Sequence, residues 1–311
     1  MKGLVIKSVG SSYTVLTTYG KKIECRIKGR LRIDGYKSTN PIAVGDKVEF
    51  AVDPDGTGVI NAVDDRKNCI IRKSKNLSKQ SHILATNVDQ AILIVTLAAP
   101  KTSFGFIDRF LATAEAYWIP TILVFNKTDM LAGDETLKEE LKKVMDVYGK
   151  VGYKCRNVSS VSMNKEEKET IASLLKDKIT LLSGHSGVGK STFVNAIEPL
   201  LDLKTQKISG THDKGMHTTT FTEMHQLSFG GYIIDTPGVK EFSVVNMEKY
   251  EVSHFFPEIF RKSKDCKFNT CLHVNEPKCA VIDAVEKGEI ALSRYHSYLS
   301  IMNGEEVVKE Y

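Results

Sequence analysis

Nine consecutive residues in the middle of the chain have the composition of a phosphate-binding loop. They read Gly184-His185-Ser186-Gly187-Val188-Gly189-Lys190-Ser191-Thr192, which matches the pattern G-x-x-x-x-G-K-[ST]. Glycines let successive backbone N–H groups point at a phosphate, and the N-terminus of a following helix adds a favourable dipole. Lys190 is expected to reach the β- and γ-phosphates and Ser191 to bind Mg²⁺. The segment predicts a nucleoside triphosphate site.

A second motif, Asn126-Lys127-Thr128-Asp129, follows an expected buried strand over residues 121–125. Ligands in α/β sheets bind at the carboxyl ends of strands. The Asp129 carboxylate can accept both the N1–H and the 2-amino hydrogens of guanine, a donor pair that adenine lacks. Asn126 and Lys127 would brace the loop, and backbone groups near Ser159 could support the base. Together with the phosphate-binding loop, this motif predicts a guanine nucleotide.

Two polar segments follow the phosphate-binding loop in the same sequence order as the two switch segments of nucleotide-binding proteins. Asp235-Thr236-Pro237-Gly238 follows an expected strand, so that Asp235 could hold Mg²⁺ through a water and the Gly238 N–H could contact the γ-phosphate. The earlier segment, residues 214–220, precedes another strand. In this order the two segments predict the switches of a GTPase. The candidate Mg²⁺ and catalytic side chains in the first switch are His217, Thr218 and Thr219.

Four potential metal ligands are crowded near the C-terminus, where Cys266, Cys271, His273 and Cys279 lie within 14 residues. Three thiolates and one imidazole form a closed tetrahedral set that suits structural Zn²⁺ and leaves no position open for catalysis. The sequence alone leaves one alternative open, in which these are unrelated buried cysteines beside a surface histidine. A redox pair is disfavoured because no C-x-x-C is present.

The elements around these motifs predict three domains in 311 residues. Residues 1–72 contain about five short β-type runs, which predict a small all-β barrel of either the oligonucleotide-binding (OB) type or the SH3-like type. Residues 73–88 are polar and basic and are expected to be a linker. Residues 89–244 alternate strands with amphipathic helices, which predicts an α/β domain with a mostly parallel sheet. Residues 245–311 are expected to be mainly helical and to bind zinc.

Composition narrows the class of protein. Apolar residues make up 41% of the chain and charged residues 26%, as in soluble globular proteins. The longest apolar run, residues 91–100, is too short to span a membrane. The six cysteines and the lack of a signal-peptide pattern predict a reducing, cytoplasmic location. Residues 1–80 carry 16 Lys+Arg and 8 Asp+Glu, which indicates either a polyanion-binding module or a solvated basic face.

The order of the motifs is unusual for a GTPase. In Ras-like GTPases the phosphate-binding loop comes first, whereas here Asn126 precedes Gly184. This order corresponds to a circular permutation, in which the same sheet is cut and rejoined between strands. The permutation moves the second switch to the end of the α/β domain, directly before the cysteine-rich region.

Taken together, the basic barrel, the permuted GTPase motifs and the Cys-Cys-His-Cys cluster resemble the ribosome small-subunit-dependent GTPase A family over nearly the whole chain. The resemblance implies GTP hydrolysis to GDP and phosphate, stimulated by the small ribosomal subunit during its late maturation. It also implies that the barrel is of the OB type and contacts rRNA. We further expect no membrane association and a monomeric chain. One departure is Met216, which stands between Gly215 and His217 where many members have a single basic residue.

The residue after the second switch glycine keeps another function open. Ras-like enzymes place a water-orienting Gln there, but this chain has Val239, which cannot orient water. The alternative is a GTP-regulated RNA-binding scaffold with negligible hydrolysis. A P-loop kinase is disfavoured by Asp129 and by the switch segments. His217 is the remaining polar candidate for positioning the water.

Overall fold

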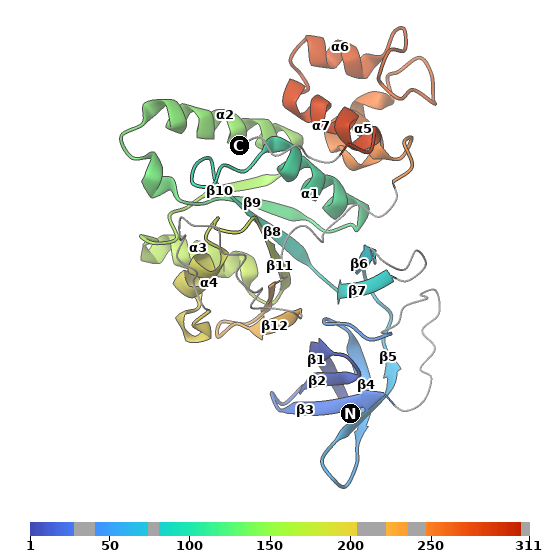
Figure 1. Cartoon of the computed structure of the whole chain (residues 1–311), viewed down its shortest axis with the longest axis vertical. Coiled ribbons are helices and arrows are strands. Elements are labelled where there is room, and N and C mark those ends of the chain that lie inside the picture. The colour runs from blue at the N-terminus through green and yellow to red at the C-terminus, as the bar shows by residue number, and fades with distance from the viewer. Residues whose placement is uncertain (28–40, 74–80, 204–221, 236–246, 306–311) are drawn as a thin grey trace. The chain divides into compact units, whose positions relative to one another are not determined.

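The computed structural model describes residues 1–27, 41–73, 81–203, 222–235 and 247–305 (Figure 1). The chain divides into two compact units. One unit contains residues 1–92 and 160–242, and the other contains residues 93–159 and 243–311. Each unit is therefore built from two separate stretches of chain.

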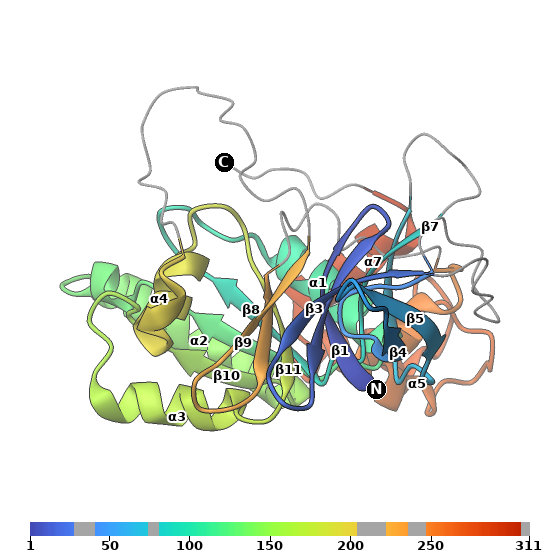
Figure 2. The same cartoon turned by 90° about the horizontal axis from the view of Figure 1, so that it is seen from below.

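The first stretch of the chain forms a closed five-stranded barrel. Its strands follow the order β1-β2-β3-β5-β4, and β1 also pairs with β4, with Leu4 opposite Lys47. The closed set is visible as the blue strands in Figure 2. Alternation along β3 explains the fold, because Ile23 and Cys25 are buried while Glu24 is exposed. The strands are β1 (Lys2–Val9), β2 (Ser12–Thr17), β3 (Lys22–Ile27), β4 (Lys47–Val52) and β5 (Gly58–Val63).

A β-ribbon follows the barrel where the sequence predicts only a linker. Strand β6 (Cys69–Lys73) pairs antiparallel with β7 (Ser81–Thr86), so part of the expected linker is a strand. The Thr86 hydroxyl donates to the buried Asp46 carboxylate at 2.7 Å. The Arg66 guanidinium donates to both oxygens of the same carboxylate. These bonds attach the ribbon to the barrel loop before β4.

The α/β part of the first unit places the phosphate-binding loop. Strand β11 pairs in parallel with β13, and β13 pairs antiparallel with β12. Every residue of β11 is buried, which is typical of a strand covered on both faces. The elements are β11 (Ile179–Ser183), β12 (Glu223–Gln226), β13 (Tyr232–Asp235), α3 (Lys165–Leu175), α4 (Lys190–Ile197) and the 3₁₀ turn η2 (Pro199–Leu201).

The second unit contains its own set of sheet strands. Strand β9 lies between β8 and β10 and pairs in parallel with β10. Strand β8 begins in the first unit and ends in this one. The elements are β8 (Gln90–Val95), α1 (Phe104–Ala116), β9 (Thr121–Phe125), η1 (Thr128–Leu131), α2 (Glu135–Val151) and β10 (Lys154–Asn157).

Short helices near the C-terminus complete the second unit. They share a hydrophobic core with α1, since Ala112 belongs to the same buried cluster as Phe256, Ile259 and Tyr298. The elements are η4 (Val252–Phe255), α5 (Pro257–Ser263), α6 (Ala280–Glu286) and α7 (Leu292–Met302). Among the described residues, no helix has the length and apolar character that a membrane span requires.

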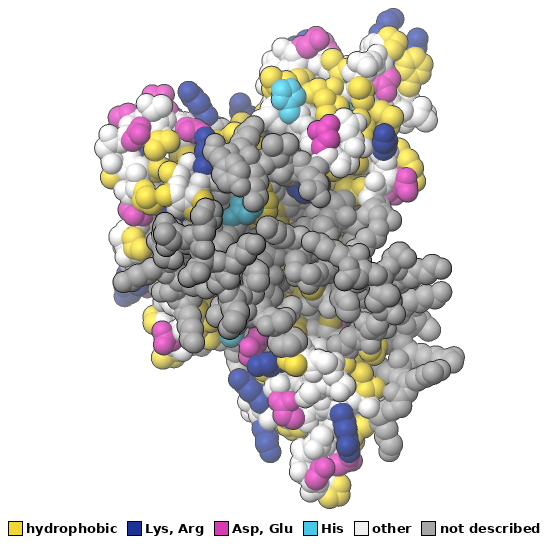
Figure 3. All heavy atoms as spheres, viewed as in Figure 1, with side chains coloured by type: hydrophobic (Ala, Val, Ile, Leu, Met, Phe, Trp, Pro, Cys, Tyr) yellow, Lys and Arg dark blue, Asp and Glu magenta, His cyan; other side chains and the backbone are white. Residues whose placement is uncertain are grey.

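Charged side chains of both signs alternate over the barrel. In the space-filling view, Lys and Arg side chains lie beside Asp and Glu side chains across the region that Figure 1 identifies as the barrel (Figure 3). Lys2 lies 3.3 Å from Glu49, and Arg26 lies 3.1 Å from Asp53. The described part of the barrel is therefore partly charge-compensated.

Candidate functional site

The predicted phosphate-binding loop connects β11 to α4, which is the strand-to-helix context that the motif requires. Three of its glycines have left-handed backbone angles, with φ of 149° at Gly184, 83° at Gly187 and 94° at Gly189. Side chains with a Cβ adopt such angles at a cost. The conformation explains why the loop needs glycine at these positions.

Lys190, the first residue of α4, folds back over this loop. Its ammonium donates to the carbonyl oxygens of Gly184 at 2.7 Å and His185 at 3.0 Å. Ser191 follows in the first helical turn and is half-buried. The ammonium and the N-terminus of α4 therefore both face the mouth of the loop, where they favour an anion.

The end of β13 lies beside the strand that leads into the loop. In the parallel register, Asp235 is opposite Leu182, two residues before Gly184. The backbone of Asp235 is thus next to the start of the loop, within the first unit. The other predicted switch residues lie outside the described residues; they are His217, Thr218, Thr219 and Gly238.

The predicted base-reading loop lies in the second unit, at the carboxyl end of β9. Asn126 is buried, and its backbone N–H donates to the Val95 carbonyl at 2.8 Å. Lys127 has a left-handed backbone with φ of 63°, and its ammonium donates to the Ala99 carbonyl. Burial lowers the pKa of Lys127. The loop is therefore held to the ends of two neighbouring strands.

The Asp129 carboxylate has a side-chain partner, Ser159, that the sequence indicates only loosely. The Ser159 hydroxyl donates to Asp129 Oδ1 at 2.6 Å. The loop after β10 is also joined to the motif by the Thr128 N–H, which donates to the Val158 carbonyl at 3.2 Å. Sequence reasoning expects backbone support from residues near Ser159, whereas its side chain orients the carboxylate directly.

The four C-terminal ligand candidates form one cluster, in which the ligand atoms of Cys266, Cys271, His273 and Cys279 lie within 4.8 Å of one another. Cys266 Sγ is 3.9 Å from Cys279 Sγ, and His273 Nδ1 is 3.4 Å from Cys279 Sγ. A tetrahedral zinc with ordinary bond lengths would separate two sulfurs by about 3.8 Å and a sulfur from a nitrogen by about 3.6 Å. The cluster could therefore hold a metal ion.

The loop that carries the ligands is held by groups that sequence reasoning missed. The Glu276 carboxylate accepts the backbone N–H groups of Leu272, Val274 and Asn275 at 2.7–3.1 Å. Burial alone would raise the pKa of Glu276, but these donors outweigh it and hold the pKa below its usual range. Its position as an acid between two ligands, His273 and Cys279, is the only signal in the sequence.

Two tyrosines of α7 support the same loop. The Tyr295 hydroxyl donates to the His273 carbonyl at 2.6 Å, and the Tyr298 hydroxyl donates to the Leu272 carbonyl at 2.7 Å. Burial lowers the pKa of His273, which favours the neutral imidazole that a metal needs. The loop is organised by the protein around it as well as by any ion.

Comparison with known proteins agrees with these features. The RsgA N-terminal domain profile matches residues 2–60, and the RsgA GTPase profile matches residues 63–245. A small ribosomal subunit biogenesis GTPase RsgA from Flavobacterium psychrophilum is 53% identical over 98% of this chain and 94% of its own length. The protein of that name from Bacteroides fragilis is also 53% identical, over 98% of this chain and 97% of its own.

Solved structures show the same architecture. The crystal structure of YjeQ from Thermotoga maritima has a TM-score of 0.78 and 36% identity, with 97% of each chain covered. The structure of YloQ, described as a circularly permuted GTPase, has a TM-score of 0.73 and 31% identity over 97% of this chain and 94% of its own. The predictions of an OB-type barrel and a permuted GTPase fold are confirmed. Because a GTPase profile matches more than half of the chain and its relatives match nearly all of it, the chain belongs to the RsgA family of GTPases.

Proposed function

We propose that this chain binds the small ribosomal subunit and assists its late maturation, hydrolysing GTP to GDP and phosphate when the subunit stimulates it. The observation that carries the proposal is similarity over almost the full length to proteins named small ribosomal subunit biogenesis GTPases, together with an intact set of nucleotide motifs. Because its proposed partner is the small ribosomal subunit, we also propose that this protein is cytoplasmic and monomeric and has no membrane contact.

In this proposal, the loop from Gly184 to Thr192 binds the phosphates. Its positive-φ glycines support this role, as does Lys190, whose ammonium would exchange its bonds to loop carbonyls for bonds to phosphate oxygens. The loop Asn126-Lys127-Thr128-Asp129 would read the guanine edge through Asp129. The hydrogen bond from Ser159 supports this assignment, because it orients one carboxylate oxygen and leaves the other to accept from the base.

Ser191 and Asp235 are the residues assigned to Mg²⁺. Both are hard oxygen donors, and the backbone of Asp235 lies beside the strand that enters the phosphate-binding loop. Bound Mg²⁺ would neutralise charge on the phosphate oxygens during transfer. Thr218 or Thr219 is proposed to complete the ligand set in the GTP state, and the Gly238 N–H to contact the γ-phosphate.

His217 is assigned to position the attacking water. Val239 stands where Ras-like enzymes have a water-orienting Gln, so hydrolysis needs another polar group. A neutral imidazole can orient or deprotonate water when it lies within about 3 Å. Docking on the subunit would bring His217 into place, so we expect slow turnover by the chain alone.

The remaining domains are assigned to attachment. Cys266, Cys271, His273 and Cys279 are proposed to hold one structural Zn²⁺, which their soft donors and spacing favour. Residues 1–72, the OB-type barrel, are proposed to contact rRNA phosphates.

The decisive experiment measures GTP turnover by the purified full chain alone, with small subunits and with large subunits. We expect slow turnover alone and a large increase only with small subunits. Tight small-subunit binding without any increase would favour the alternative, a GTP-regulated scaffold with negligible hydrolysis, which Val239 keeps open. Equal stimulation by large subunits would contradict the proposal.

A further inference from the structure

The helix that follows the predicted phosphate-binding loop also holds the chain that leads to the predicted first switch. Asn195, near the end of α4, makes two hydrogen bonds to the backbone of one residue, Leu203. Its Nδ2 donates to the Leu203 carbonyl and its Oδ1 accepts from the Leu203 N–H, both at 2.8 Å. Leu203 is the last described residue before residues 204–221, the first-switch segment. Two bonds to one residue fix both the position and the orientation of the backbone where this segment begins.

Asn195 lies on the same side of α4 as the proposed magnesium ligand. Ser191 and Asn195 are four residues apart, so their side chains lie on one face of the helix, about 6 Å apart along its axis. Helical side chains lean toward the N-terminus of their helix, so Asn195 reaches back in the direction of Ser191. The first-switch segment therefore begins beside the helix face that also carries the residue assigned to Mg²⁺.

The end of α4 that supports Asn195 is itself attached to the sheet. Glu198 is 3% exposed, and its carboxylate accepts the Ser228 N–H at 2.6 Å. Ser228 lies in the turn that joins β12 to β13, and β13 ends at Asp235. All these residues belong to the first unit. Because α4 is joined to the phosphate-binding loop at its start and to this hairpin at its end, Asn195 projects from a rigid support.

The two ends of the first-switch segment are held in different ways. After the segment, Glu223 of β12 pairs with Asp235 on one side and with Lys7 of β1 on the other. Before the segment, Leu203 lies outside any helix or strand, and among the described residues its backbone bonds only to Asn195. The fixed start of the segment therefore depends on a single side chain.

The start of a switch matters because GTPase switches are ordered in one nucleotide state. The γ-phosphate and Mg²⁺ hold them, and they are released when GTP becomes GDP. Each residue that becomes ordered on binding loses conformational entropy. When the start of a segment is fixed in advance, the segment has less freedom left to lose as it closes on the ion.

We propose that Asn195 is a positioning residue for the GTP state. By fixing Leu203, it lowers the entropy cost at which Thr218 or Thr219 reaches Mg²⁺. The inference rests on the proposed function, which assigns these threonines to the ion. A side chain that only stabilised the fold would affect the binding of GTP and GDP equally, so the two roles have different consequences.

The test measures the affinity of the full chain for two nucleotides in the presence of Mg²⁺. One is GDP, and the other is the non-hydrolysable GTP analogue with an imido group between the β- and γ-phosphates. Asn195→Ala should weaken binding of the analogue by about tenfold, because about two more residues must then be ordered on binding. Its affinity for GDP should stay unchanged, since GDP does not hold the switch.

A second variant changes only one of the two bonds. Asn195→Asp has the same size and keeps an acceptor for the Leu203 N–H, but it places a carboxylate oxygen against the Leu203 carbonyl. Binding of the analogue should therefore weaken in this variant too, again with GDP binding retained. An Asn195→Asp variant that binds the analogue like the wild type would contradict a role for the paired bonds.

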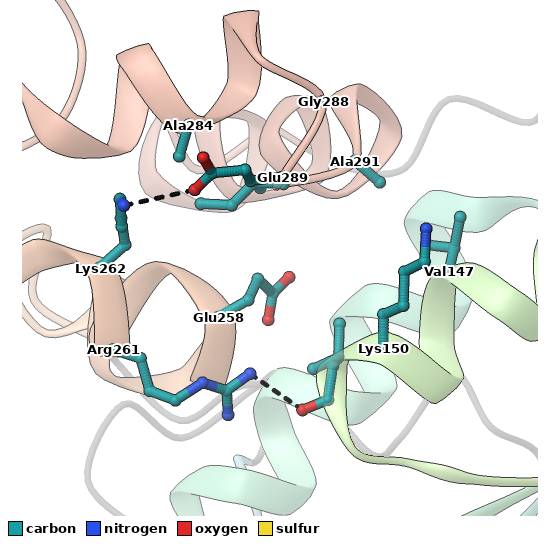
Figure 4. A pocket seen from close by; sticks show the side chains of 11 residues that line it. Val147, Lys150, Glu258, Arg261, Lys262, Ala284, Gly288, Glu289 and Ala291 are labelled. Atoms are coloured by element: carbon teal, nitrogen blue, oxygen red, sulfur yellow. Dashed lines mark hydrogen bonds and ion pairs between the residues drawn. The ribbon is translucent and has the colours of Figure 1, made fainter.

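Two control variants remove comparable hydrogen bonds elsewhere. Asn164→Ala, in the first unit, loses the bond that Asn164 accepts from the Glu167 N–H at 2.9 Å. Arg261→Met, in the second unit, loses the bond to the Val151 carbonyl at 3.0 Å, beside a cavity of about 320 Å³ lined by α2 and α5 (Figure 4). Both controls should keep the wild-type ratio of the two affinities, because neither bond touches the first-switch segment.

Removal of Mg²⁺ separates positioning toward the ion from a general effect on the loop. In EDTA, Asn195→Ala and the wild type should bind the analogue equally, since no ion is present for a threonine to reach. An equal loss of GDP and analogue binding, a loss that persists without Mg²⁺, or an unchanged affinity for the analogue would each overturn the proposal. If the wild-type chain binds neither nucleotide, the proposed function fails as well; if it binds both and the Asn195 variants match it, only the positioning role fails.

Discussion

At the scale of single residues, the proposed reading of guanine depends on how one carboxylate is oriented. Asp129 keeps one oxygen engaged by Ser159, so its position would be set before a base binds. Asp129→Asn replaces an acceptor with an amide donor. The variant should lose GTP affinity and gain affinity for xanthosine triphosphate, whose 2-oxo group accepts a hydrogen bond. The change in preference should reach about 10⁴-fold, measured by competition binding. A variant that still prefers GTP would contradict the base-reading role.

The variant His217→Ala tests the role of this histidine in catalysis rather than in binding. Since it is assigned only to the water, His217→Ala should retain GTP affinity, subunit binding and the slow basal rate. Subunit-stimulated turnover should fall by about a hundredfold, the lower end for acid–base contributions. His296→Ala, an exposed histidine of α7, is the matched control and should turn over normally. Full stimulation of the His217 variant would transfer the role to rRNA or to another residue.

At the scale of elements, sequence periodicity predicts the segments that are locally determined. The buried strand expected over residues 121–125 has those bounds in the structure, where it is β9. Strand β7 is missed because the polar and basic residues 73–80 before it are typical of a linker. Its pairing with β6 also depends on another segment. The predicted cysteine and histidine cluster comes together, but the support from Glu276 depends on backbone geometry that no motif encodes.

No sequence pattern indicates that Arg294 contributes to stability. It is 1% exposed, and it pairs with Asp108 of α1 at 2.8 Å as well as with Glu258 of α5. Arg294→Met should destabilise the chain by about 3–5 kcal/mol, because two buried carboxylates lose their partner. Urea unfolding measures the effect. Lys287→Met, which breaks an exposed ion pair with Asp283, should have little effect; similar losses would contradict the network's importance.

The stability of the helical region that carries the Cys-Cys-His-Cys cluster should depend on the proposed zinc ion. Cys271→Ala should lose one zinc per chain, and the folding free energy lost with a structural zinc is on the order of 10 kcal/mol. Elemental analysis measures the metal, and limited proteolysis should show cleavage within residues 245–311, with nucleotide binding largely retained. Cys155→Ala, a half-buried cysteine outside the cluster, should keep its zinc. Wild-type protein without zinc would refute the assignment.

At the scale of the whole molecule, the distribution of charge should govern attachment to RNA. Residues 28–40 carry four Lys+Arg and one Asp, and residues 74–80 carry two Lys. Five of the eight net positive charges of residues 1–80 therefore lie in these two segments, outside the described residues. Within the barrel, Lys21 and Lys22 are exposed, whereas Arg26 is paired with Asp53. The sequence alone could not distinguish exposed cations from cations that are paired with a carboxylate.

Subunit binding, and with it the stimulated turnover, should weaken steeply with salt through counterion release, while the basal turnover of the free chain should not. Reversing Lys21 and Lys22 to Glu should weaken binding and reduce the slope of log affinity against log salt by about 2, one for each phosphate contact. GTP affinity should be unchanged. Reversing Lys142 and Lys168, exposed on α2 and α3, changes the net charge equally and should leave the slope as it is. If both pairs of substitutions alter the slope alike, net charge governs attachment and the barrel has no special role.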